Sequence, residues 1–286
     1  MRIANYGNRA VIVEGQVGAE RFYYLDELSG GRFGSRCEDV FDCWDELTSW
    51  YSQRSIDESD GAKQVDMNLL GPPSPAPRQV FGVGLNYRDY VESAGIEPPV
   101  TLPPIFTKYV SSFSGPTSAV AIPPGTTVDW EIELVVIVGK SGRDILVDDA
   151  WSHVAGVTAG QDLSDRVLQN RGPSPQSGLG KSFPGFAPQG PWLVSPDEFD
   201  DPDDLGLRCV VNGATMQLSR TSQMIYSVPM IVSGLSKTVE LLPGDVIFTG
   251  TPAGVGFART PPKFLSAGDT VESWIEGIGN LRQTFV

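Results

Sequence analysis

Three acidic residues alternate with apolar residues in the stretch VDWEIELVVIVG, residues 128–139. This alternation predicts a strand, and because successive strand side chains point to opposite faces, Asp129, Glu131 and Glu133 share one face. Glu131 and Glu133 then project roughly 7 Å apart, and carboxylates that converge in this way can chelate a hard divalent cation such as Mg²⁺. The alternative, for the strand alone, is an edge strand with a solvated acidic face.

A second acidic stretch, QDLSDRVLQ at residues 161–169, could complete such a metal site. Asp162 is a candidate third ligand that would come from a neighbouring segment. Ser164 or Asp165 is instead expected to cap the N-terminus of a helix, because such side chains accept hydrogen bonds from the free backbone N–H groups there.

Two loops rich in small residues could bind a substrate beside these acids. In GLGKSFPGF, residues 178–186, Lys181 could bind an anionic substrate or stabilise negative charge near a metal, or it could simply be exposed. In PGDVIFTGTPAGVG, residues 243–256, a predicted strand runs into small residues that let a ligand approach the backbone. Thr249 and Thr251 offer hydroxyls there, and a tight turn is the alternative. A P-loop is excluded, because no Lys-Ser/Thr pair ends the stretch.

The composition excludes several classes of partner. The chain has 286 residues, 40% of them hydrophobic, and a formal net charge of −14 from 35 acidic and 21 basic residues. Nucleic acids and anionic membrane surfaces require a basic protein surface, so neither is an expected partner. The three cysteines match no metal-binding spacing, and no signal peptide or transmembrane stretch is visible. We therefore expect a cytoplasmic protein with reduced thiols.

The elements that must position these residues fall into two predicted domains. Residues 1–72 predict a small α/β unit, with short strands in RIANYGNRAVIVEGQV and RFYYLDEL and a helix over residues 37–54. Four prolines between Gly71 and Arg78 favour an extended linker. Residues 73–286 predict a β-rich α+β domain, with strands in residues 80–84, 104–109, 119–123, 129–139, 207–213, 245–250 and 270–279. Helices are expected in residues 87–95, 147–156, 165–170 and 224–239.

Seven stretches between Gln79 and Val286 together resemble the fumarylacetoacetate hydrolase family, in the order GVGLNYRDY, PPIFTKYVSSFSGP, DWEIELVVIVGK, VAGVTAGQDLSDRVLQ, GKSF, VNGATMQ and LLPGDVIFTGTPAGVG. The likeness is to bacterial members of the 2-hydroxyhepta-2,4-diene-1,7-dioate isomerase and acylpyruvase type. It implies a mixed β-sandwich roll that usually forms a homodimer. It also implies a bound divalent cation, Mg²⁺ or alternatively Mn²⁺ or Ca²⁺, and a small dicarbonyl carboxylic acid as substrate.

The resemblance also implies roles for individual residues. The family's metal ligands fall on Glu131, Glu133 and Asp162. The residues that usually hold or polarise the carboxylate and keto oxygens of the substrate fall on Arg166, Gln169, Lys181 and Thr251. Of these, we expect Lys181 and Arg166 to take part in catalysis, and Gln169 and Thr251 to bind substrate.

One part of the family's pattern is missing. Members that hydrolyse or decarboxylate commonly carry a His and, three residues later, a Glu on a lid, but Tyr90 and Ser93 occupy these positions here. Glu92, one residue earlier, is a candidate replacement base, and Tyr87 and Tyr90 are candidate substrate contacts. The only histidine, His153, is expected to be structural.

The predicted reaction follows from an intact metal site and an altered lid. We expect metal-dependent hydrolysis of a C–C bond in an acylpyruvate or fumarylacetoacetate-like acid, with the cation stabilising the enolate. Because hydrolysis needs a base to activate water, decarboxylation or enol–keto isomerisation of a related keto acid is the alternative. A non-catalytic protein that binds such acids is the third reading.

Overall fold

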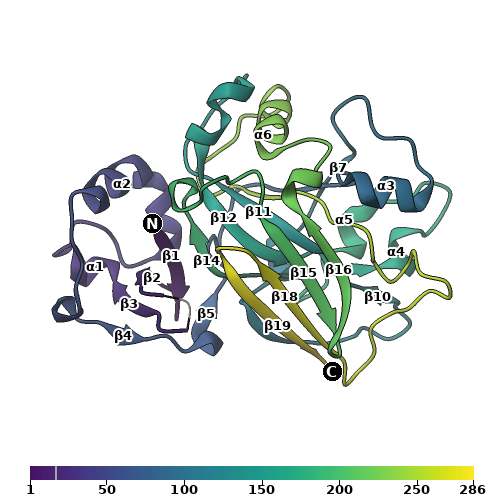
Figure 1. The fold of residues 1–286 in the computed structure, drawn as a ribbon, viewed down its shortest axis with the longest axis horizontal. Coiled ribbons are helices and arrows are strands. Elements are labelled where there is room, and N and C mark those ends of the chain that lie inside the picture. Colours follow the sequence, from purple (N-terminus) through teal and green to yellow (C-terminus); the bar gives the residue numbers. More distant parts are fainter. Residues whose placement is uncertain (17) are drawn as a thin grey trace.

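The computed structural model describes residues 1–16 and 18–286 and shows a strand-rich α+β fold, which confirms the predicted class. In Figure 1 the N-terminal elements lie at one end of the molecule, and α3 (Arg88–Ala94) and α4 (Arg166–Gln169) lie at the other. Most of the strands belong to two larger sheets. No helix in the described ranges is long and apolar enough to cross a membrane.

The largest sheet runs through the whole molecule. Its order is β4-β3-β2-β1-β14-β12-β11-β17-β6-β7, with β5 paired to β1 and β8 paired to β14. Its strands are β1 (Arg2–Tyr6), β2 (Arg9–Glu14), β3 (Arg21–Tyr24), β4 (Lys63–Gln64), β5 (Leu70–Gly71), β6 (Val80–Val83), β7 (Ile105–Thr107), β8 (Phe113–Ser114), β11 (Ile132–Val138), β12 (Val154–Gln161), β14 (Ala187–Val194) and β17 (Val246–Phe248).

The second sheet and the helices complete the fold. The second sheet has the order β16-β15-β18-β19-β9, and a separate short pair joins β10 to β13. These strands are β9 (Thr117–Val120), β10 (Val128–Asp129), β13 (Ser164–Asp165), β15 (Gly206–Val211), β16 (Ala214–Arg220), β18 (Thr270–Ile275) and β19 (Gly279–Phe285). The other α-helices are α1 (Leu25–Leu28), α2 (Trp44–Ser52), α5 (Ser177–Gly180) and α6 (Val228–Ser236). Short 3₁₀ helices span Cys37–Cys43, Glu58–Asp60, Met67–Leu69, Val110–Ser112, Val147–His153, Pro196–Glu198 and Thr221–Gln223.

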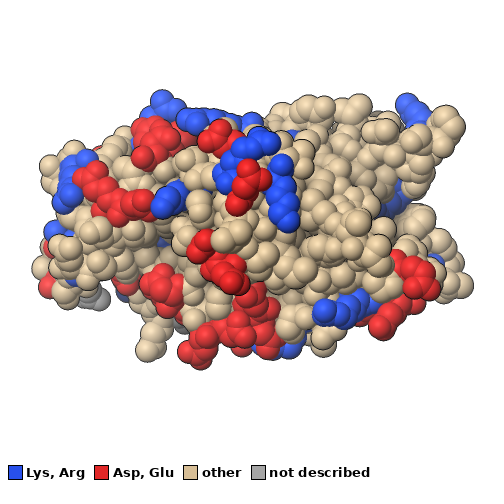
Figure 2. Space-filling model, turned by 90° about the horizontal axis from the view of Figure 1, so that it is seen from above, with Lys and Arg blue, Asp and Glu red and all other residues tan. Residues whose placement is uncertain are grey.

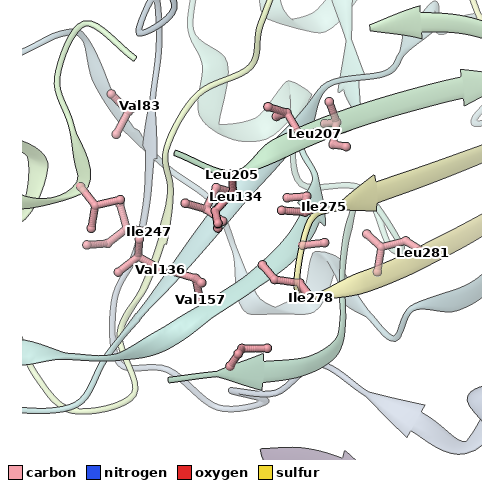
Figure 3. Close-up of a cluster of buried hydrophobic side chains, with 14 of the residues drawn as sticks. Val83, Leu134, Val136, Val157, Leu205, Leu207, Ile247, Ile275, Ile278 and Leu281 are labelled. Carbon is pink, nitrogen blue, oxygen red and sulfur yellow. The ribbon is translucent and has the colours of Figure 1, made fainter. Parts of the chain in front are cut away.

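The main core fills the space between the two sheets. In the cluster of Figure 3, Leu134 of β11 lies towards Leu207 and Ile275 of the second sheet, and Val136 lies further along β11. All four are buried. Burial of apolar area on this scale is the dominant stabilising contribution to such a fold. The strand that carries the acidic residues is therefore anchored by its apolar side chains.

The predicted N-terminal unit shares its sheet with the rest of the chain. β1 pairs antiparallel with β14, through Ile3 and Leu193. One hydrophobic cluster also joins Leu25 and Leu47 of the N-terminal region to Ile137 of β11. The division into residues 1–72 and 73–286 stays a prediction.

The structure differs from the predicted elements in three places. The predicted strand over residues 129–139 is divided, because β10 leaves the large sheet to pair with β13 before β11 begins. The predicted helix over residues 147–156 is a 3₁₀ turn followed by β12. Four long strands, β12, β14, β16 and β19, and four two-residue strands, β4, β5, β8 and β13, were not predicted. Glycine, proline and polar residues mask the pattern of the long ones. In β12 the glycines are needed for close packing: a Cβ on Gly156 would lie 2.4 Å from the carbonyl oxygen of Val194.

Candidate metal and substrate site

The division between β10 and β11 brings the acidic residues to one place. Asp129 ends β10, Glu131 lies in the short break, and Glu133 lies on β11. β12 runs antiparallel to β11 and ends at Gln161, so Asp162 follows directly beside the break. The backbone N–H of Asp162 donates to the carbonyl of Glu131 at 2.9 Å. The two acidic stretches that the sequence separates therefore meet at the end of one strand pair.

Glu131, Glu133 and Asp162 form a group that could hold a divalent metal ion. Each offers a carboxylate oxygen, and these oxygens lie within 4.8 Å of one another. Glu131 is 7% exposed, Glu133 1% and Asp162 is fully buried. Hard cations such as Mg²⁺ and Mn²⁺ prefer oxygen ligands of this kind. The structure thus assembles the three residues that the sequence selected as metal ligands.

Lys181 lies against two of these carboxylates. Its Nζ donates to Glu131 Oε2 at 2.7 Å, to Asp162 Oδ2 at 2.6 Å and to Ser164 Oγ at 2.8 Å. Burial alone would lower the pKa of Lys181, but the charges of Asp162 and Glu131 outweigh burial and raise it. Lys181 is therefore a buried, charged partner of the acidic group and not an exposed loop residue.

Lys108 is a second buried cation, which the sequence reasoning missed. Its Nζ donates to Asp162 Oδ1 at 2.6 Å and also contacts the carbonyl of Lys181. Burial lowers the pKa of Lys108 although Asp162 opposes that effect. The only signal in the sequence is a lysine that directly follows an apolar strand, in PIFTK. Because four buried acids require charge partners, a lysine next to a buried strand is a candidate for that role.

Arg166 joins Glu131 to Asp129. Its Nε and Nη2 donate to Asp129 Oδ2 at 2.9 and 2.7 Å, and its Nη2 also donates to Glu131 Oε1 at 2.5 Å. The N–H groups of Gly256 and Phe257 donate to Asp129 as well, at 2.7 and 3.0 Å. Asp129 is fully buried. This corrects the solvated acidic face considered for the strand.

α4 presents Arg166 and Gln169 to the same site. As expected from the sequence, Asp165 caps this helix, and its carboxylate accepts the N–H groups of Val167 and Leu168. Arg166 Nη1 donates to Gln169 Oε1 at 2.9 Å, and Gln169 Nε2 donates to Ser177 Oγ at 3.1 Å. The cap fixes the start of a very short helix, and so fixes the direction in which the guanidinium points.

Glu133 is the least satisfied of the buried acids. It accepts the backbone N–H of Gly250 at 2.8 Å, and no basic side chain in residues 1–16 and 18–286 forms an ion pair with it. Burial, together with the nearby charges of Asp162 and Glu131, raises the pKa of Glu133 well above its ordinary value. A buried carboxylate without a partner is costly, so a cation shared by the three acids fits this donor set.

A cavity of about 240 Å³ opens onto these groups. The predicted site residues that line it are Tyr90, Glu131, Glu133, Arg166, Gln169, Lys181 and Thr251. Phe106 forms another part of the wall, and Lys181 Nζ lies 5.1 Å from the centre of its ring. Thr251 Oγ1 donates to the carbonyl of Ile132 at 2.8 Å, which fixes the turn after β17 against the break before β11. The cavity is small enough to suit a compact acid.

The predicted site residues that do not line this cavity are Asp162, Tyr87 and Glu92. Asp162 is fully buried and is joined to the lining through its ion pair with Lys181. Tyr87 is fully buried in the main core and does not line the cavity, and its hydroxyl has no hydrogen-bond partner among the described residues. Glu92 lies on the exposed side of α3, because a helix turns about 100° per residue and Tyr90 takes the inward face. The geometry thus does not support the expected substrate contact of Tyr87 or the base role of Glu92. His153 also lies elsewhere, with its Nδ1 3.1 Å from the carbonyl of Lys140.

Figure 2 shows how charged side chains are distributed on one face of the molecule. Basic and acidic side chains are interspersed there, and no continuous basic tract is visible on this face. Most of the acidic excess is therefore spread over the surface, whereas the acids and cations at the cavity are closely matched.

Residues 79–286 match the family described as fumarylacetoacetate hydrolase, C-terminal. The human mitochondrial oxaloacetate tautomerase FAHD2A is 44% identical over 208 residues, which cover 72% of this chain and 66% of that protein. The chain thus spans about two thirds of the length of such curated relatives.

Two solved structures extend the likeness to the whole fold. One is a candidate HpcE protein from Mycobacterium smegmatis, 47% identical with a TM-score of 0.92, covering 100% of this chain and 99% of that one. The other is a 2-hydroxyhepta-2,4-diene-1,7-dioate isomerase from Mycobacterium marinum, 31% identical with a TM-score of 0.75, covering 100% and 98%.

Proposed function

The chain belongs to the fumarylacetoacetate hydrolase family, and from this premise we propose that it is a metal-dependent enol–keto tautomerase of a small dicarbonyl acid such as oxaloacetate. One observation carries the choice of reaction. The cavity presents charged groups that can stabilise an enolate, but its described lining residues include no histidine and no carboxylate outside the metal group. Tautomerisation needs no attacking water, and therefore needs no base to activate one.

Glu131, Glu133 and Asp162 would hold the cation, which could be Mg²⁺, Mn²⁺ or Ca²⁺. When bound, the cation supplies Lewis-acid stabilisation of negative charge on a substrate oxygen. Lys181 adds a fixed positive charge at the same place, because Glu131 and Asp162 hold its ammonium group beside the acidic group.

The charge balance of the site supports an anionic substrate. The carboxylates of the metal group and of its ion pairs are Asp129, Glu131, Glu133 and Asp162, and the cations paired with them are Lys108, Arg166 and Lys181. Without a metal the group carries one excess negative charge, and a divalent cation would reverse that sign. Together with its metal, the cavity would attract a carboxylic acid anion in spite of the net charge of the chain.

Arg166 and Gln169 are suited to orient the substrate. The guanidinium lines the cavity, and Asp129 and Gln169 fix its plane through separate nitrogens. Four of the five N–H groups of Arg166 are donated to Asp129, Glu131 and Gln169, so one N–H and the fixed positive charge remain for a substrate carboxylate. Arg166 can therefore hold the carboxylate of the acid while the keto or enol group faces Lys181.

The sequence-based expectation of C–C hydrolysis is the competing activity. It would require a water-activating base, and Glu92 and His153 both lie away from the cavity. The relatives named as a tautomerase and an isomerase favour the reaction without water, although their names describe those proteins alone. Homodimer formation and a cytoplasmic location stay predictions from the sequence.

A substrate panel tests this proposal. The purified protein with Mg²⁺ is mixed with the enol form of oxaloacetate and, separately, with an acylpyruvate. We expect the ultraviolet absorbance of the enol to decay faster than in buffer, with no release of CO₂ and no cleavage of the acylpyruvate. The Glu131→Gln variant and chelator-treated protein are the controls. Entry of ¹⁸O from labelled water into a new carboxylate would establish a hydrolase instead, and release of CO₂ would establish a decarboxylase.

A further inference from the structure

Tyr90 is a titratable residue of the described cavity lining that forms no ion pair and does not belong to the metal group. Glu131 pairs with Arg166 and Lys181, so all three are held in ion pairs. The remaining titratable residues of the lining are Glu133, which belongs to the metal group, and Tyr90. The hydroxyl of Tyr90 forms no hydrogen bond within the described ranges. It is therefore free to interact with a ligand.

The start of α3 is fixed to the turn that carries Thr251. Asn86, just before the helix, donates through Nδ2 to the carbonyl of Thr249 at 2.8 Å and accepts the N–H of Tyr226 at 2.8 Å. Asp89 accepts the hydroxyl of Ser219 at 2.9 Å and the N–H of Ala253 at 3.3 Å. Tyr90 follows directly, so its ring is held in the cavity wall.

The surroundings keep Tyr90 in its neutral form. Burial raises the pKa of Tyr90, the charge of Glu131 raises it further, and Arg166 and Lys181 oppose these effects without reversing them. Its phenol consequently carries a proton at neutral pH. A neutral phenol beside fixed cations can give a proton to a developing carbanion, because the cations stabilise the negative charge that remains.

We infer that Tyr90 is the proton-transfer residue of the proposed tautomerase. This inference rests on the proposed function. The phenol O–H bond breaks, and its proton forms a new C–H bond at the carbon next to the enolate carbon. The electron pair of the enolate C=C bond makes that C–H bond, and the C–O bond becomes C=O. In the same step the enol O–H bond breaks and its proton passes to the phenolate oxygen, so Tyr90 ends protonated and the cycle needs no outside acid or base.

The test compares Tyr90→Phe with the wild type, using the enol form of oxaloacetate and Mg²⁺. The variant keeps the ring but loses the proton, so kcat should fall by about 10²-fold to 10⁴-fold, while KM and Mn²⁺ affinity change little. In D₂O the wild type should place deuterium on one face of the carbon. The variant should lose that stereospecificity, because solution protonation has no preferred face.

Two further variants separate the chemical role from a structural one. Ser93→Ala is the matched control, since Ser93 is exposed on the same helix and its hydroxyl only donates to the carbonyl of Tyr90. It should behave as the wild type. Tyr90→His should regain part of the lost turnover and the stereospecific label, because imidazole can also carry the proton.

The outcomes distinguish this inference from the proposed function. If folded Tyr90→Phe turns over the substrate at the wild-type rate and labels it stereospecifically, the role of Tyr90 is overturned and the proposed tautomerase function stands. A wild type that does not accelerate tautomerisation would overturn both. Unchanged Mn²⁺ affinity in Tyr90→Phe shows that the site is folded. If Tyr90→Phe does not fold, the Tyr90→His variant takes its place, and a Tyr90→His protein that binds Mn²⁺ normally but is inactive would contradict the inference. Random labelling by the wild type would also contradict it.

Discussion

Asp129 and Glu133 come from one acidic stretch and are almost equally buried, yet their surroundings differ completely. Asp129 accepts two hydrogen bonds from Arg166 and three from backbone N–H groups. Glu133 accepts one backbone N–H and has no ion-pair partner in the described part of the chain. The comparison teaches that a fully satisfied acid positions its neighbours, whereas an incompletely satisfied acid is available to a ligand.

The largest expected effect comes from Glu133→Gln. We expect Mn²⁺ affinity to fall by about 100-fold or more, since even residues that only orient metal ligands commonly contribute 10-fold to 100-fold. In the metal-free protein, at a pH above the raised pKa of Glu133, the same change removes an unpartnered buried charge, so the melting temperature should rise by about 2–4 °C for each kcal/mol gained. Calorimetric titration measures the Mn²⁺ affinity, and thermal melts of chelator-treated protein measure the melting temperature. Unchanged Mn²⁺ affinity would remove Glu133 from the metal group.

Asp129→Asn should have the opposite effects, a large loss of stability and a small change in Mn²⁺ affinity. The amide cannot replace a carboxylate that accepts both Arg166 and backbone donors, so we expect a loss of about 3–5 kcal/mol in the free energy of unfolding, as for other broken buried ion pairs. Mn²⁺ affinity of the folded protein should change by less than about tenfold. Urea unfolding measures the free energy of unfolding, and calorimetric titration measures the Mn²⁺ affinity. A large loss of metal affinity with normal stability would make Asp129 a ligand, and so abolish the contrast with Glu133.

The pH dependence of metal binding should sharpen the contrast. Because the folded-state pKa of Glu133 lies above its ordinary value, metal-free protein holds a proton there at mildly acidic pH. The cation must displace that proton, so affinity should rise with pH, by up to about tenfold per unit, until the pH exceeds this raised pKa. Calorimetry in buffers of different ionisation enthalpy measures the protons released. Binding without proton release at pH 6 would argue that Glu133 is already ionised.

The raised pKa of Glu133 has the opposite effect on folding stability, which should fall as pH rises. An acid whose pKa is raised on folding binds more protons when folded, so its contribution disfavours the folded state increasingly as pH rises from its ordinary pKa to the raised one. A bound divalent cation should remove this loss, since it stabilises the ionised carboxylate.

The smallest effect is expected for Glu92→Gln. Glu92 is exposed on α3 and lies outside the cavity lining, so stability should change by less than about 0.5 kcal/mol and turnover should stay near the wild-type value. Steady-state kinetics with the same substrate panel measure this. A tenfold loss of turnover would restore Glu92 as a base and show that α3 changes position during the reaction.

Much of this site was predictable from the types of its residues. Glu131, Glu133 and Asp162 are hard to bury without a common partner, and Lys181 and Arg166 carry the charges that such acids require. Residue types and spacing alone did not separate Asp129 from Glu133, and only the family resemblance left Asp129 without a ligand role. The physical difference between them depends on where β10 leaves the sheet. That departure is determined by pairing with β13, 35 residues later, and not by local pattern.

Other features were hidden for different physical reasons. Lys108 carries no local signal, since its partners come from distant segments. The strands β12 and β14 contain glycines that close packing requires, and glycine is otherwise a sign of turns. The inward direction of Tyr90 and the outward direction of Glu92 depend on how α3 is fixed at its start, which Asn86 determines through the distant Thr249 and Tyr226.

The pairing of β1 with β14 has a practical consequence for handling this protein. The family match begins at residue 79, so a fragment cut there would keep every candidate metal ligand and look complete by alignment. It would nevertheless leave the backbone of β14 with unpaired hydrogen-bonding groups where β1 had been, and it would uncover apolar side chains of β11 that now pack on the N-terminal region. Open strand backbones recruit other chains, so the first 72 residues protect the catalytic sheet from aggregation.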